Sequence, residues 1–127
     1  MNNSKKKIAI TTGDVNGIGT EVTIKALNAL NLDAANVVLI SNSAVLKFYE
    51  KLLKESRYLP KNYVSVLDRF ELVEIPFAME DINPGSLTEQ SGEFSFQSLI
   101  KACDLAKSGQ ISSIVTAPVS KEALYLA

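Results

Sequence analysis

Short apolar runs rich in β-branched residues alternate along the chain with longer stretches in which apolar residues recur every three or four positions. Runs of the first kind predict strands, and spacing of the second kind predicts amphipathic helices. The strand patterns cover residues 7–12, 36–40, 63–67, 70–75 and 111–115. The helical patterns cover residues 20–31, 44–54, 92–108 and the stretch that starts at Ser120. This alternation favours an α/β domain with a mostly parallel sheet and helices on both faces.

Two packing expectations follow from the helical patterns. In the first helix, an apolar stripe is expected to face the core, and it consists of Val22, Ala26, Leu27 and Leu30. In the third helix, Cys103 falls close to the apolar spacing, so we expect this thiol to be buried and structural.

Composition narrows the classes of function. The 127 residues are enough for one domain with its own core, and the formal net charge of −1 gives no reason to expect a nucleic-acid partner. No stretch approaches the roughly 20 apolar residues that a membrane span needs, so no membrane partner is expected. The single cysteine excludes an internal disulfide and suits a reducing compartment. The chain has no histidine, which removes the commonest metal ligand and the commonest general base.

A glycine-rich loop follows the first predicted strand. Three glycines in seven positions allow positive φ angles and bring backbone N–H groups close to whatever lies above the next helix. The spacing is that of neither a P-loop nor a dinucleotide fingerprint. Two interpretations stay open, anion binding and a tight turn with helix capping. The candidate binding residues of this loop are Gly13, Asp14, Asn16, Gly17, Gly19 and Glu21.

A second candidate segment follows the last predicted strand. Thr116, Ala117 and Pro118 come where that strand ends, and ligands of open α/β sheets bind at such strand ends. Lys121, one turn further, could neutralise a phosphate or carboxylate there and is the candidate catalytic residue. The alternative is an ordinary solvated lysine on a helix surface.

Both segments resemble signatures of the 4-hydroxythreonine-4-phosphate dehydrogenase family. The opening loop Gly13-Asp14-x-Asn16-Gly17-Ile18-Gly19-x-Glu21 is similar to the first signature, and residues 116–124 are similar to the second. Between them, Pro84-Gly85-Ser86-Leu87-Thr88-x-x-Ser91-Gly92 resembles the family loop that leads into the helix before the second signature. The resemblance therefore spans nearly the whole chain.

The resemblance implies a fold like that of isocitrate and isopropylmalate dehydrogenases, of which this chain would be an incomplete part. Residues 1–127 would form the N-terminal part of a two-domain, cytoplasmic enzyme that works as a homodimer. That enzyme would use NAD to oxidise and decarboxylate a small phosphorylated substrate, 4-phosphooxy-threonine, in pyridoxal phosphate (vitamin B6) synthesis. A divalent metal (zinc, magnesium or cobalt) would be held by family histidines that do not occur among these residues, so this chain alone is expected to be inactive.

Two alternatives remain open at the level of function. One is a related dehydrogenase that acts on a phosphorylated sugar acid or a dihydrodiol. The other is a non-catalytic module that binds phosphate or nucleotides.

Overall fold

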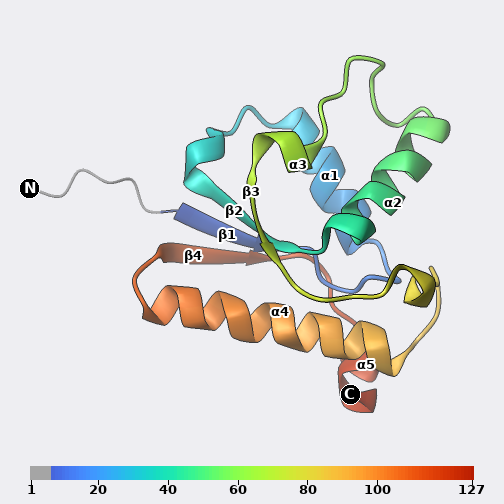
Figure 1. Cartoon of the computed structure of the whole chain (residues 1–127), viewed down its shortest axis with the longest axis vertical. Coiled ribbons are helices and arrows are strands. Elements are labelled where there is room, and N and C mark those ends of the chain that lie inside the picture. Colours follow the sequence, from blue (N-terminus) through green and yellow to red (C-terminus); the bar gives the residue numbers. More distant parts are fainter. Residues whose placement is uncertain (1–6) are drawn as a thin grey trace, which may run out of the picture.

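The computed structural model describes residues 7–127, and its centre is a sheet of four parallel strands (Figure 1). The strands are β1 (Lys7–Thr11), β2 (Val37–Ser41), β3 (Glu71–Glu74) and β4 (Ile111–Thr116). They lie in the order β3-β2-β1-β4, so β1 pairs with both β2 and β4. The predicted α/β class with a parallel sheet is confirmed.

Helices cover both faces of the sheet (Figure 1). The helices α1 (Gly19–Ala29) and α2 (Ser43–Glu55) lie on one face, and the long α4 (Glu89–Lys107) lies on the other. The final helix, α5 (Lys121–Leu126), packs against α4. Short helical turns lie in the connections, and they are η1 (Ala34–Asn36), α3 (Val66–Arg69) and η2 (Met79–Asp81).

The strand β2 is the most deeply buried of the four strands. All five of its residues are buried, as the continuous apolar run predicts for a strand that is covered on both faces. Leu39 and Ile40 are fully buried, and each such side chain contributes roughly 1.5–3 kcal/mol relative to exposure. Leu46 of α2 and Phe94 of α4 belong to the same cluster, so one core joins the sheet to helices on both faces.

The order of the strands creates a switch point beside β1. The chain builds β1, β2 and β3 outward in one direction and then returns to place β4 on the other side of β1. In open α/β sheets a crevice forms where the order reverses, outside the carboxyl ends of the strands. Such a crevice is expected here beyond Thr11 and Thr116, where β1 and β4 end.

The strand predicted over residues 63–67 is wrong. Ser65 caps a helix instead, because its Oγ accepts a hydrogen bond from the backbone N–H of Leu67 at 3.1 Å, and α3 begins at Val66. A hydroxyl that bonds its own backbone competes with an extended conformation. The strand predicted over residues 70–75 is confirmed as β3, although it is shorter.

Two helix ends follow from capping. The helix α4 begins at Glu89 rather than near Gly92, because the Oγ1 of Thr88 accepts from the N–H of Ser91 at 3.1 Å. It ends at Lys107, and Gly109 adopts the predicted left-handed conformation with φ +79°. The helix predicted from Ser120 is confirmed as α5, with Ser120 as its cap.

The predicted inner face of α1 is largely wrong. Val22 and Leu30 are 46% and 53% exposed, and of the predicted stripe only Leu27 is buried. The buried face is turned toward Thr20, Thr23 and Ile24, because α1 packs beside α2.

The prediction that Cys103 is buried is also wrong, since the thiol is exposed. The face of α4 that packs on the sheet includes Ser95, Ser98 and Ala102. Cys103 follows Ala102 directly, and a step of one residue turns a side chain about 100° around a helix.

Candidate functional site at the ends of β1 and β4

The loops that follow β1 and β4 meet at the end of the sheet. The backbone N–H of Ala117 donates to the carbonyl oxygen of Thr11 at 3.0 Å, and the N–H of Asp14 donates to the carbonyl oxygen of Pro118 at 3.1 Å. We call residues 13–19 the glycine loop and residues 116–120 the second loop. The two predicted segments are therefore in direct backbone contact at the switch point.

Two glycines permit this close approach. Gly13 has φ +75°, and a Cβ atom there would overlap the carbonyl oxygen of Pro118. A Cβ atom at Gly19 would overlap the carbonyl oxygen of Thr12 and crowd the side chain of Ala117. Any larger residue at either position would force backbone apart, because overlaps with backbone atoms cannot be relieved by a rotamer change.

Side chains of α2 and α4 hold the glycine loop, and a side chain of the loop itself bonds to a third segment. The Tyr49 hydroxyl of α2 donates to the carbonyl oxygen of Val15, and the Ser95 hydroxyl of α4 donates to the carbonyl oxygen of Gly13 at 3.2 Å. The side chain of Asn16 bonds to the turn before α4. The loop is thus fixed from both faces of the sheet.

The glycine loop ends at the N-terminus of α1. Ile18 is the N-cap residue and offers no side-chain hydrogen bond, so the first turn of α1 has no side-chain cap. Within the described part of the chain, the buried hydroxyl of Thr20 in that first turn also has no hydrogen-bond partner. The N-terminus of a helix carries partial positive charge and favours anions.

Acidic side chains flank the loop on the side of Tyr49. Burial, together with the nearby carboxylates of Asp14 and Glu21, raises the pKa of Tyr49 to about 12. The Oδ1 of Asp14 accepts from the N–H of Asn16 at 3.1 Å, and Glu21 pairs with Lys25 at 3.1 Å. Both carboxylates are therefore engaged in local contacts of the loop and α1.

Lys121 is the first residue of α5 and is exposed. Among residues 7–127 its ammonium group forms no hydrogen bond or ion pair, so the group can move toward an anion. The position of α5 is set by a close helix crossing, because a Cβ atom at Gly92 of α4 would overlap the carbonyl oxygen of Ala123. The Ser120 hydroxyl accepts from the N–H of Ala123 at 3.1 Å and caps α5.

The predicted site residues differ in how accessible they are. The buried ones are Gly13, Asn16 and Gly19. The half-buried ones are Asp14, Gly17, Glu21 and Ala117, and the exposed ones are Thr116, Pro118 and Lys121. The glycine loop can thus offer mainly backbone groups, whereas the second loop and Lys121 offer accessible side chains.

A hollow of about 540 Å³ lies beside the second loop. It is lined by Thr116, Ala117 and Pro118 together with apolar side chains of β1 and α1, among them Ile10 and Val22. No residue of the glycine loop lines it. The exposed stripe of α1 therefore forms one wall of an apolar hollow next to the candidate site.

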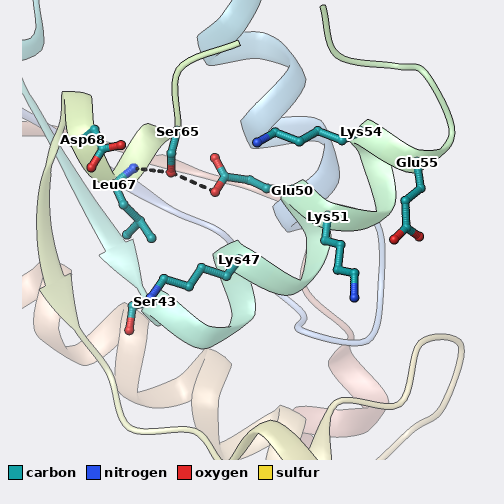
Figure 2. A pocket seen from close by; sticks show the side chains of 9 residues that line it. All are labelled: Ser43, Lys47, Glu50, Lys51, Lys54, Glu55, Ser65, Leu67 and Asp68. Carbon is teal, nitrogen blue, oxygen red and sulfur yellow. Dashed lines mark hydrogen bonds between the residues drawn. The ribbon is translucent and has the colours of Figure 1, made fainter. Parts of the chain in front are cut away.

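Sequence reasoning missed a second hollow, of about 680 Å³, between α2 and α3 (Figure 2). At its base the buried carboxylate of Glu50 accepts hydrogen bonds from the Tyr63 hydroxyl, the Ser65 hydroxyl at 2.8 Å and the Val66 N–H at 3.1 Å. Burial and the bond to Glu50 raise the pKa of Tyr63. A glutamate on the apolar face of α2 was the signal that could have revealed this contact.

Three lysines of one helix line this second hollow. The side chains of Lys47, Lys51 and Lys54 all extend from α2, the helix that also carries Glu50 (Figure 2). None of the predicted site residues lines it, so it is separate from the ends of β1 and β4.

Residues 7–127 contain no cluster of three or more His, Cys, Asp or Glu side chains that could hold a metal ion. These residues do not fit a metal centre. Among the same residues, no helix has the length and apolar character that a bilayer span requires.

Comparison with known proteins gives both relatives and structures. The D-threonate 4-phosphate dehydrogenase of Salmonella typhimurium is 34% identical, over 96% of this chain and 39% of that protein. The 4-hydroxythreonine-4-phosphate dehydrogenase of Helicobacter acinonychis is 32% identical, over 92% of this chain and 36% of its own length. This chain thus spans well under half the length of these relatives.

Solved structures agree with the sequence relatives. A 4-hydroxythreonine-4-phosphate dehydrogenase from Klebsiella pneumoniae superposes with a TM-score of 0.78 at 29% identity, over 96% of this chain and 40% of that one. The same enzyme from Burkholderia phymatum gives a TM-score of 0.79 at 26% identity, over 98% and 39%. The model of the family described as pyridoxal phosphate biosynthetic protein PdxA matches residues 15–127. The resemblance found in the sequence is confirmed, and the chain belongs to the PdxA family.

Proposed function

We propose that this chain supplies one wall of the active site of an NAD-dependent dehydrogenase whose substrate is a small phosphorylated acid. The observation that carries the proposal is the direct contact of the two loops at the switch point, where α/β folds bind ligands. The family membership supports dehydrogenase chemistry, since the relatives named above are dehydrogenases of phosphorylated substrates.

The groups of this chain would bind and orient the substrate. Backbone N–H groups at the start of α1 attract anions, and Lys121 of α5 adds a mobile positive charge. We assign the phosphate or carboxylate of the substrate to these groups, with Asp14, Gly17, Thr116 and Pro118 as the accessible neighbours. NAD, when bound, would supply the acceptor for the hydride that leaves the substrate carbon.

Two substrates deserve a direct comparison. The first candidate is 4-phosphooxy-threonine, whose oxidation and decarboxylation would serve pyridoxal phosphate synthesis. The second is D-threonate 4-phosphate, a phosphorylated sugar acid, because the Salmonella relative is named for it and is 34% identical. The two molecules share a carboxylate, a hydroxyl group on C3 and a phosphate on C4. They differ at C2, which carries an amino group in the first and a hydroxyl group in the second. The groups assigned above would serve either one.

The remaining proposals concern the whole protein. Residues 1–127 would form the N-terminal part of a two-domain enzyme that acts in the cytoplasm as a homodimer. The metal of such an enzyme would need ligands from outside the described residues, since these do not fit one.

The test is to assay the whole protein with NAD and each substrate in turn, and to follow NADH formation. We expect turnover with at least one of the two, and the ratio of their kcat/KM values identifies the substrate. The chain of 127 residues, assayed alone, should give no turnover. If the whole protein oxidises neither compound but calorimetry shows that it binds phosphate or nucleotides, it is a non-catalytic module and the proposal fails.

A further inference from the structure

Asn16 connects the glycine loop to the turn that precedes α4. The residue is only 3% exposed. Its Oδ1 accepts from the backbone N–H of Asn83 at 2.8 Å, and its Nδ2 donates to the Oγ1 of Thr88 at 3.4 Å. Its backbone carbonyl oxygen accepts from the N–H of Gly85 at 2.7 Å. Three contacts thus join one loop residue to a segment about 70 positions away in sequence.

The chemistry of the amide suits this position. Asparagine offers an acceptor and a donor on one short side chain, and here both are used by protein groups. An aliphatic side chain at this position would leave the Asn83 N–H without its partner, and an unsatisfied buried group is costly. Asn16 is therefore committed to the turn and is a poor candidate for direct contact with a ligand, contrary to the role that its motif suggests.

The contact extends into α4. Thr88, which accepts from Asn16, also caps α4 through Ser91, and Ser95 one turn later donates to the carbonyl oxygen of Gly13 at 3.2 Å. The glycine loop, the turn over residues 83–88 and the start of α4 form one hydrogen-bonded unit. In Figure 1 the segment between η2 and α4 lies at the end of the sheet where β1 and β4 terminate.

We propose that Asn16 is a positioning residue that fixes the turn over residues 83–88 against the glycine loop, so that this turn is a third wall of the site. The inference rests on the proposed function for the identity of the ligand. The coupling between loop and turn stands on the contacts alone.

The test compares three variants of the 127-residue chain with the unmodified chain by amide hydrogen exchange and by NMR titration with inorganic phosphate. In Asn16→Ala we expect exchange of the Asn83 and Gly85 amides to rise by roughly tenfold, the effect of losing about one hydrogen bond. The amides of β2 should keep their protection. The phosphate-induced shifts of the glycine-loop amides should require a severalfold higher phosphate concentration.

Two further variants serve as controls. Asn16→Asp retains the acceptor for the Asn83 N–H, so exchange should stay near that of the unmodified chain. It is read by exchange alone, because its negative charge repels phosphate. Asn83→Ala is the matched control: it also removes an amide side chain, but Asn83 makes its contact through the backbone, so exchange should not change.

The outcomes separate the two proposals. Unchanged exchange at Asn83 and Gly85 in Asn16→Ala, or an equal rise in β2, would overturn the positioning role. If phosphate shifts no amide of the glycine loop in the unmodified chain, the phosphate assignment of the proposed function fails, while the exchange data still decide the role of Asn16.

Discussion

At the scale of single residues, the candidate site depends on the absence of side chains as much as on their presence. Gly13 lies directly against the carbonyl oxygen of Pro118 and has φ +75°. Gly109 has a similar φ of +79°, but open space surrounds the position of its missing Cβ atom. Substituting each glycine in turn therefore distinguishes the free-energy cost of a left-handed backbone, which both positions share, from that of steric overlap, which arises only at Gly13.

We predict that Gly13→Ala destabilises the chain more than Gly109→Ala does. A left-handed conformation costs an alanine about 1–2 kcal/mol in both variants, and forced displacement of packed backbone adds about 1–3 kcal/mol in Gly13→Ala only. The measurement is the free energy of unfolding in urea. Equal losses in the two variants would mean that the two loops are not in the close contact described here.

At the scale of elements, buried polar contacts between segments decide where helices begin. The carboxylate of Glu50 in α2 gathers three donors from residues 63–66, and this contact holds the chain at the start of α3. Glu55, on the same helix, is exposed and shares none of these donors.

We predict that Glu50→Ala lowers the free energy of unfolding by about 3 kcal/mol, because three donors lose a charged acceptor. The control Glu55→Ala should change it by less than about 0.5 kcal/mol, as is usual for surface substitutions. Urea unfolding measures both values. A loss in Glu50→Ala as small as that of the control would show that water replaces the carboxylate without cost.

The same contacts explain how much could be predicted from the sequence. The run over residues 37–40 and the Ser120 cap are local signals, and both predictions were confirmed. The strand predicted over residues 63–67 was wrong because Ser65, which caps α3, is held by the carboxylate of Glu50, which lies more than ten residues away in sequence. The face of α1 was also misjudged, because apolar side chains lie on two sides of that helix.

For the candidate site, too, the local features could be predicted and the contacts between distant segments could not. The sequence placed both loops at strand ends, since that requires only the local patterns. Their mutual contact depends on the strand order, in which β4 returns beside β1, and no local pattern predicts that order. The role of Asn16 depends on residues 83–88 and could be found only from the structure.

At the scale of the whole molecule, the reversal of strand order brings the site together. β1 lies between β2 and β4, so the glycine loop and the second loop leave the sheet side by side. The hydrogen bonds between Asp14 and Pro118 and between Ala117 and Thr11 then make them one surface. Lys121 follows this surface on α5, where α4 holds the helix closely at Gly92. The central claim is that this surface binds the phosphate or carboxylate of the proposed substrate.

The most direct measurement is the KM of the whole protein for the proposed phosphorylated substrate in Lys121→Ala, compared with Lys101→Ala, which removes an exposed lysine from α4. A hydrogen bond to a charged group contributes about 1.5–3 kcal/mol, so the account predicts that KM rises roughly 10- to 100-fold in Lys121→Ala. In Lys101→Ala, KM should be unchanged. A KM and a kcat that stay at the unmodified values in Lys121→Ala would contradict the account.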